Sequence, residues 1–75
     1  MLDSIIQVFR NVLDNDSLKF TESATHDDIE GWDSLAHLMI VSELGQEFKL
    51  TFTMEEIMDM KKISDIIEII EKKKR

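Results

Sequence analysis

The sequence contains no cysteine, no proline and only two glycines among its 75 residues. Without cysteine, the chain offers neither a disulfide framework nor a cysteine-based metal site. Without proline and with so little glycine, it shows no flexible linker, and only the basic end at residues 72–75 is compositionally biased. We therefore expect one small, mostly helical domain over residues 1–75.

Long apolar runs and a targeting segment are also missing. No stretch approaches the roughly 18 apolar residues that are needed to span a bilayer. The segment from Met1 to Gln7 lacks the basic region and following apolar run of a signal peptide. We expect a cytoplasmic monomer without stable membrane insertion.

Basic residues are scarce relative to acidic ones. Sixteen acids and nine bases give a formal net charge of −7, and four of the nine bases lie in residues 72–75. A surface this acidic repels nucleic acid and favours partners that present basic patches. We therefore expect protein partners with basic docking patches and no nucleic acid.

The spacing of apolar residues predicts a helical bundle. Ile5, Val8, Phe9 and Val12 recur at helical intervals and define one buried stripe, which Asp3 or Ser4 would cap. The expected helices are three main ones and a short third one: Leu2 or Asp3 to Leu13, Ser34 to Phe48, Thr53 to about Asp59 or Met60, and Ile63 to Lys73. The fold class predicted is an all-α four-helix bundle.

Residues 15–33 form a long and acidic connection between the first two helices. Leu18, Phe20 and Ile29 are its expected anchors to the core, and Trp32 is expected to fix its entry into the second helix. Long connections in compact domains are often functional. The function of this domain is therefore sought near the end of the connection.

Capping residues and apolar faces mark the later helices. Asp33 is the expected N-cap of the second helix, and Thr53 with Glu56 matches a capping box. The second helix is apolar over much of its surface and is expected near the centre of the bundle. Gly45 marks either close packing or a less stable second half of this helix. The third helix offers three candidate core residues, which are Ile57, Met58 and Met60.

Ser34 stands where the acidic connection meets the second helix, and it has three possible roles: cap, nucleophile or attachment point. Asp33, Ser34 and His37 are close in sequence, but a hydrolase also needs an oxyanion hole and a sheltered cleft. We interpret His26 and His37 as surface or rim residues. The sequence therefore disfavours self-contained serine catalysis.

The acidic connection also lacks the spacing of a metal site. His26, Asp27, Asp28 and Glu30 are clustered without a recognisable ligand pattern. The segment from residue 14 to 25 begins like a calcium-binding loop, yet it has leucine and lysine where a ligand and the turn glycine belong. A solvated acidic loop is the favoured interpretation.

The segment Asp33-Ser34-Leu35, after Gly31-Trp32 and before a long apolar helix, resembles the Asp-Ser-Leu signature of acyl carrier proteins and peptidyl carrier domains. The order and spacing of the helices, the long acidic loop and the short capped helix resemble the same family over residues 2–72. The resemblance implies the acyl-carrier type of four-helix bundle.

The resemblance also implies a function. Ser34 would receive 4′-phosphopantetheine from coenzyme A through a separate magnesium-dependent phosphopantetheinyl transferase, and the arm's thiol would carry an acyl or aminoacyl thioester. The domain would have no catalytic activity and would meet acyl- or aminoacyl-loading and transfer enzymes. The residues expected to face these partners are Asp33, Leu35, Leu38, Met39, Glu43, Glu47, Ile57 and Met58. The alternative is a helical adaptor or regulatory domain without a prosthetic group.

Three positions depart from the pattern of fatty-acid-synthesis carriers. Met39, Gly45 and Gln46 stand where those carriers usually show acids on the second helix. The segment from Ser34 to Leu38 instead resembles stand-alone carriers of specialised pathways. The sequence thus favours a specialised role in lipid, polyketide, peptide or cell-surface sugar chemistry over the housekeeping one.

Overall fold

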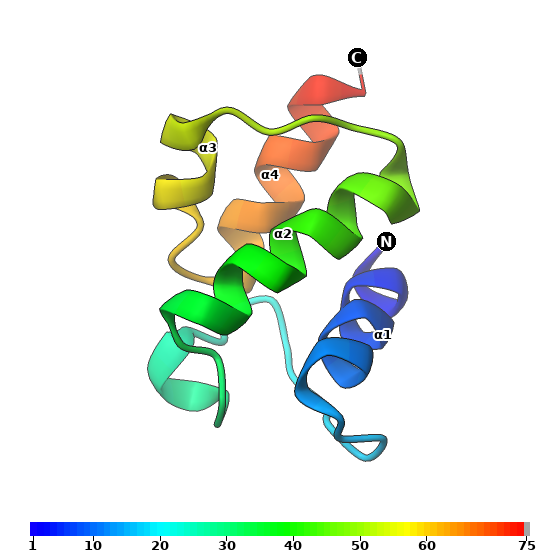
Figure 1. Ribbon diagram of the computed structural model, residues 1–75, viewed down its shortest axis with the longest axis vertical. Coiled ribbons are helices and arrows are strands. Elements are labelled where there is room, and N and C mark those ends of the chain that lie inside the picture. The colour runs from blue at the N-terminus through cyan, green and yellow to red at the C-terminus, as the bar shows by residue number, and fades with distance from the viewer. Residues whose placement is uncertain (75) are drawn as a thin grey trace.

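A computed structural model describes residues 1–74 of the chain, and it is all-α, as predicted. The described part measures 31 × 20 × 20 Å along its principal axes. Its elements in chain order are α1 (Leu2–Leu13), the 3-10 turn η1 (His26–Asp28), α2 (Ser34–Phe48), α3 (Met54–Asp59) and α4 (Ile63–Lys73) (Figure 1). The predicted basic end reaches Arg75, which lies outside the described residues.

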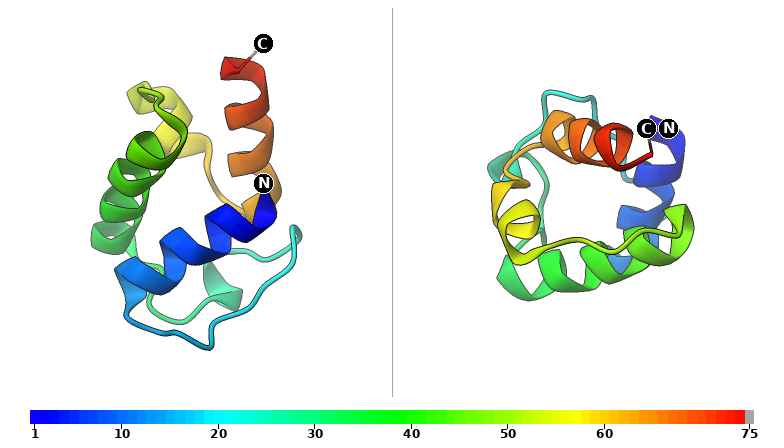
Figure 2. Two further views of the ribbon diagram at one scale, coloured as in Figure 1. Left: turned by 90° about the vertical axis from the view of Figure 1, so that its right-hand side faces the viewer. Right: turned by 90° about the horizontal axis from the view of Figure 1, so that it is seen from above.

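The four α-helices surround one core. Seen from above, α2 and α4 lie on opposite sides, while α1 and α3 close the other two (Figure 2). Each helix contributes apolar side chains to the centre, and the largest fully buried ones are Phe9, Ile5, Ile40, Leu44, Met60, Ile63, Ile66 and Ile70. The buried stripe predicted for the first helix is confirmed, with Val12 half-buried at its edge.

The start of α1 differs from the prediction. Met1 is the N-cap residue, and it makes no side-chain capping hydrogen bond, so neither Asp3 nor Ser4 caps the helix. Asp3 lies in the first turn instead, where its carboxylate favours the positive end of the helix dipole. The helix ends at Asp14, whose left-handed backbone (φ 52°) turns the chain away.

The connection between α1 and α2 contains more structure than the sequence indicated. Thr25 forms an isolated antiparallel bridge with Lys62, and the amide of Ile63 donates to the carbonyl of Ala24 at 2.9 Å. These partners are nearly 40 residues apart, so no local pattern reveals them. Leu18, Phe20 and Ile29 pack against the core as predicted, Ile29 most deeply.

The second helix is buried on one side only, which corrects the expectation that it lies at the centre. Leu35 is 71% exposed and Leu38 is 55% exposed, because both project from the face turned away from α1 and α4. Gly45 does mark close packing, since a Cβ at this position would lie 2.9 Å from the carbonyl oxygen of Leu50. Because glycine has no Cβ, the turn after α2 can lie tight against the helix, and the amide of Leu50 donates to the carbonyl of Gly45 at 3.0 Å.

Helix α3 begins with the predicted capping box. Glu56 N donates to Thr53 Oγ1 at 3.1 Å, and Thr53 N donates to Glu56 Oε1 at 2.8 Å. Of the three candidate core residues, only Met60 is fully buried; Ile57 is half-buried and Met58 is exposed. A helix of six residues turns only a few positions toward the core, and Ile57 takes one of them. The assignment of Met58 to the core is therefore wrong, while its exposure is compatible with its other predicted place, on the surface that faces partners.

Lys73 ties the end of α4 to α3. Its ammonium lies 2.8 Å from Glu56 Oε1 and 3.1 Å from Oε2. The hydrogen bond from Lys73, and then the backbone hydrogen bond at Thr53, lower the pKa of Glu56 below its usual value of 4.5. A carboxyl with a lowered folded-state pKa stabilises the fold above its unfolded-state pKa, and this contribution is lost as the pH falls through the folded-state value.

Replacing Lys73 with methionine should therefore destabilise the protein modestly at pH 7 and make a smaller difference at pH 3, because the contribution of this pair is lost as the pH falls through the folded-state pKa of Glu56. Urea unfolding of both proteins at the two pH values measures the difference. Lys72→Met, at an exposed neighbouring lysine, is the matched control. An equal destabilisation by Lys73→Met at both pH values would show that the lysine acts through the cation–π contact of its ammonium with the Phe52 ring, which does not depend on the charge of Glu56.

Candidate functional site

Ser34 is the first residue of α2, and its exposed side chain is free of the capping role. Asp33 provides the cap, because its Oδ1 accepts from the amide of Ala36 at 2.8 Å. The carbonyl of Asp33 also accepts from the amide of His37 at 2.8 Å. Just before, Gly31 adopts a positive φ of 92°, which turns the chain into the helix. This order of residues presents the Ser34 hydroxyl at the surface.

The predicted cap is thus confirmed, and its strength can be measured. Asp33→Ala removes the only side-chain acceptor at the start of α2 and should lower the free energy of unfolding by about 0.5–2 kcal/mol. Asp33→Asn keeps a capping oxygen and should recover most of the loss. Urea unfolding followed by circular dichroism compares the three proteins. A loss as large for Asn as for Ala would mean that the charge, not the cap, matters.

His37 corrects the prediction that both histidines lie at the surface or rim, whereas His26 is half-buried, as expected of a rim residue. His37 is only 9% exposed and accepts at Nδ1 from the Trp32 indole N–H at 2.9 Å. Its Nε2 must therefore carry the hydrogen, which it donates to the carbonyl of Ile57 at 2.8 Å. His37 thus joins the loop before α2 to the last turn of α3.

His26 completes a layered cluster around Trp32. Its ring stacks on the indole with centroids 3.7 Å apart, and its two nitrogens lie 3.1 Å from the carbonyl oxygens of Trp32 and Met60. On the opposite side, Phe9 meets the indole edge-on at 4.9 Å. Trp32 is thereby buried as predicted, and it anchors the connection to the core.

These contacts decide what the histidines can do chemically. A general base needs a ring nitrogen that is free to face the hydroxyl it deprotonates. Both nitrogens of His37 already face Trp32 and Ile57, and both nitrogens of His26 face backbone carbonyls. Neither histidine is therefore arranged as a partner of Ser34 in a hydrolase.

A pocket of about 480 Å³ opens beside Ser34 between the start of α2 and α3. We call it the Ser34 pocket. Its lining residues are His26, Asp33, Ser34, His37, Leu38, Met54, Ile57 and Met58. In Figure 1 and in the right-hand view of Figure 2, η1, α3 and the first turn of α2 lie on the same side of the molecule. The fold thus brings together residues more than 30 positions apart in sequence.

Five of the residues singled out from the sequence meet in the Ser34 pocket: Asp33, Ser34, Leu38, Ile57 and Met58. Sequence reasoning missed the roles of His26, His37 and Met54. The signal for His37 was its place three positions after Ser34, on the same helix face. No signal pointed to His26, because its contacts with Trp32 and Met60 depend on how the connection folds.

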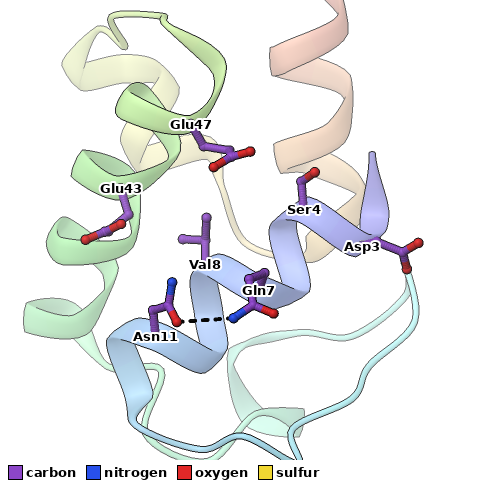
Figure 3. Close-up of a pocket in the computed structure, with 7 residues that line it drawn as sticks. All are labelled: Asp3, Ser4, Gln7, Val8, Asn11, Glu43 and Glu47. Carbon is purple, nitrogen blue, oxygen red and sulfur yellow. Dashed lines mark hydrogen bonds between the residues drawn. The ribbon is translucent and has the colours of Figure 1, made fainter.

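Two of the acids expected to face partners lie elsewhere. Glu43 and Glu47 line a groove of about 270 Å³ between α1 and α2, opposite Asp3, Ser4 and Gln7 (Figure 3). Gln7 Nε2 donates to Asn11 Oδ1 at 3.2 Å along the floor of this groove. The two glutamates therefore face the α1 side of α2, away from the Ser34 pocket.

Residues 1–74 contain neither a metal-binding cluster nor a membrane-spanning helix. This part of the chain contains no group of three or more histidine or acidic side chains placed to hold a metal ion. None of its helices combines the length and the apolar character that crossing a membrane requires.

Comparison with known proteins places the site in a family. The family model for the phosphopantetheine attachment site matches residues 3–70. An acyl carrier protein homolog from Mycoplasmopsis pulmonis (strain UAB CTIP) is 40% identical over 57 residues, which cover 76% of this chain and 77% of that protein. The solution structure of holo acyl carrier protein from Geobacter metallireducens superimposes with a TM-score of 0.84 at 32% identity, covering 95% of this chain and 82% of that one. The chain therefore belongs to the family of acyl carrier proteins, which carry acyl groups on a 4′-phosphopantetheine prosthetic group.

Proposed function

We propose that Ser34 is the residue to which 4′-phosphopantetheine is attached. One observation carries the proposal: Ser34 is an exposed hydroxyl at the start of α2 whose capping role is taken by Asp33. Its neighbours Asp33 and Leu35 complete the Asp-Ser-Leu segment, and the matched family region includes it. By contrast, Ser4, Ser23 and Ser64 lie away from the pocket beside α3.

The residues around Ser34 fit this group. A phosphate ester on Ser34 Oγ would lie at the N-terminus of α2, where the first amide N–H groups have no partner within the helix and the dipole favours an anion. The exposed apolar side chains of Leu38, Met54 and Met58 would face the arm at the mouth of the Ser34 pocket. When bound, the group supplies the thiol that forms the acyl thioester, which this cysteine-free chain lacks.

We further propose that the chain depends on a separate enzyme for its own modification and has no catalytic activity. The engaged ring nitrogens of His26 and His37 support this, because neither histidine has a ring nitrogen free to deprotonate Ser34. A phosphopantetheinyl transferase would bring the base, the magnesium ion and coenzyme A. Asp33 is then exposed for contact with a basic patch of that enzyme while it caps α2.

We propose that partner enzymes dock on an apolar surface formed by Leu35, Leu38, Met39 and Met58, beside the half-buried Ile57. The four are between 50% and 71% exposed. Leu38 and Met58 line the Ser34 pocket, and Met39 lies further along α2, beside Asn11 and Val12 of α1. Methionine side chains are flexible and polarisable, which suits a surface that meets several enzymes in turn. Glu43 and Glu47 would extend the contact only for partners that reach over α2 toward α1.

The test is the intact mass of the purified protein after incubation with coenzyme A, magnesium and a broad-specificity phosphopantetheinyl transferase. The expected result is the gain of one phosphopantetheinyl group. A folded sample that gains nothing, beside a control carrier that is modified, would favour the helical adaptor. Labelling by an active-site phosphonate probe would instead indicate a serine hydrolase.

A further inference from the structure

The two histidines of the Ser34 pocket separate its mouth from the core. The mouth is apolar and exposed, with Leu38, Met54 and Met58 between 55% and 70% accessible. The inner side is polar, since His26 and His37 line the pocket and bond to the backbone of α3 and of the residue that follows it. We call this inner side the histidine wall.

We propose that the histidine wall keeps long acyl chains out of the core, so that the cargo of this carrier is a short acyl group held at the mouth of the Ser34 pocket. The proposal rests on the attachment of the prosthetic group to Ser34. It makes His37 a specificity-determining residue, through its position between α2 and α3.

The hydrogen bonds of the wall resist the entry of a chain. A chain that moved from the pocket into the core would have to part α2 from α3, which breaks the 2.8 Å bond from His37 to the carbonyl of Ile57. It would also disturb the bond from Trp32 to His37 and the contact of His26 with Met60. Buried donors and acceptors that lose their partners are strongly unfavourable, because neither water nor the alkyl chain replaces them.

The core behind the wall is occupied by fully buried side chains. Ile40 and Ile63 are 0% exposed and Met60 is 1% exposed, so an entering chain must displace packed side chains. The free energy of breaking these hydrogen bonds and displacing these side chains is already required when the first methylene groups enter. A short chain can bury its few methylene groups against Leu38, Met54 and Met58 without breaking any bond. The pocket therefore suits short cargo.

The histidine wall also offers the cargo few free hydrogen-bonding groups. Every buried side-chain nitrogen and oxygen within the described residues already has a hydrogen-bond partner. Both ring nitrogens of His37 are used in this way, and both ring nitrogens of His26 face backbone carbonyl oxygens. Recognition at the mouth is therefore mainly by apolar contact with the methionines and Leu38, while the exposed carboxylate of Asp33 in the lining disfavours an anionic acyl group.

The experiment compares thioesters of two lengths on the holoprotein. The transferase loads butanoyl- or dodecanoyl-phosphopantetheine from the corresponding coenzyme A thioester, intact mass verifies loading, and hydroxylamine then cleaves the thioester. For the natural sequence we expect the two cleavage rates to agree within about twofold, since neither chain is sequestered. Dodecanoyl cleavage that is slower by about fivefold or more would mean a mostly sequestered chain and would overturn the proposal.

His37→Leu replaces the polar part of the wall with an apolar side chain. In this variant we expect the dodecanoyl thioester to be cleaved about fivefold more slowly than the butanoyl thioester. Gln46→Leu adds a leucine on the exposed side of α2, outside the Ser34 pocket, and should behave like the natural sequence. If His37→Leu does not fold by circular dichroism, Trp32→Phe, which removes the donor to His37 and keeps a smaller aromatic ring, takes its place. Equal cleavage of both lengths in a folded wall variant would also overturn the proposal.

A failure to load separates the two proposals. If no mass is gained, attachment at Ser34 is wrong, and the histidine wall is then tested with free dodecanoyl-pantetheine. In amide NMR spectra of the natural sequence, this probe should leave the core positions Ile66 and Ile70 unshifted. Shifts at these positions would show that a long chain enters the core and would contradict the histidine wall.

Discussion

Replacing Ser34 with alanine should abolish modification by the phosphopantetheinyl transferase completely, so that the intact mass of the variant stays unchanged under conditions that convert the natural protein fully. The reason is chemical, because the phosphate ester needs an oxygen on the side chain and alanine has none. The fold should survive, since alanine favours a helix and the cap on Asp33 remains. Ser34 is exposed, so no packing is lost.

The control for this result is Ser42→Ala, which removes another exposed hydroxyl from the same helix. This variant should be modified like the natural protein. Circular dichroism and thermal unfolding verify that all three proteins are folded. A Ser34→Ala protein that still gained one phosphopantetheinyl group would place the attachment elsewhere and would refute our assignment.

Replacing Trp32 with alanine should cause the largest loss of stability of any single change near the site. Trp32 is 4% exposed, stacks on His26 and meets Phe9 edge-on. Truncation of a buried tryptophan to alanine costs about 3–5 kcal/mol through lost burial and the cavity left behind. The variant also leaves Nδ1 of His37 without its donor. The free energy of unfolding of such domains is only about 5–15 kcal/mol, so this loss should raise the unfolded fraction strongly.

Trp32→Phe separates the two parts of this effect. Phenylalanine keeps an aromatic ring between Phe9 and His26 but removes the indole N–H, so we expect a smaller loss of about 1–3 kcal/mol from the unpaired acceptor. Urea unfolding followed by circular dichroism measures both variants. A loss below about 1 kcal/mol for Trp32→Ala would mean that the indole does not anchor the connection.

Much of the fold could be predicted because its signals are local. The stripe of Ile5, Val8 and Phe9 predicts α1, and Thr53 with Glu56 predicts the start of α3, because helix periodicity and capping involve residues within one or two turns. The attachment serine also stands out locally, at the junction of the connection and α2. The start of α1 was predicted less well. Asp3 or Ser4 was expected as the cap, but Met1 is the N-cap residue and makes no side-chain capping hydrogen bond.

The predictions that were wrong concern exposure, which depends on what packs against a residue. Met58 was expected in the core, but α3 is too short to turn it inward, and it lies exposed at the pocket mouth. His37 was expected near the surface, but the loop carrying Trp32 and the last turn of α3 cover it. Such burial arises from elements that are distant in sequence.

The sequence by itself determined the helices, the caps on α2 and α3 and the presented serine, since each depends on neighbouring residues along the chain. Only the tertiary structure decided that His26 and His37 are engaged with Trp32 and with backbone carbonyls beyond it. It also decided that Glu43 and Glu47 face α1 instead of the Ser34 pocket. The physical reason is that a hydrogen-bonding or charged side chain acquires its role from the partner it meets, and these partners are brought near only when the core forms.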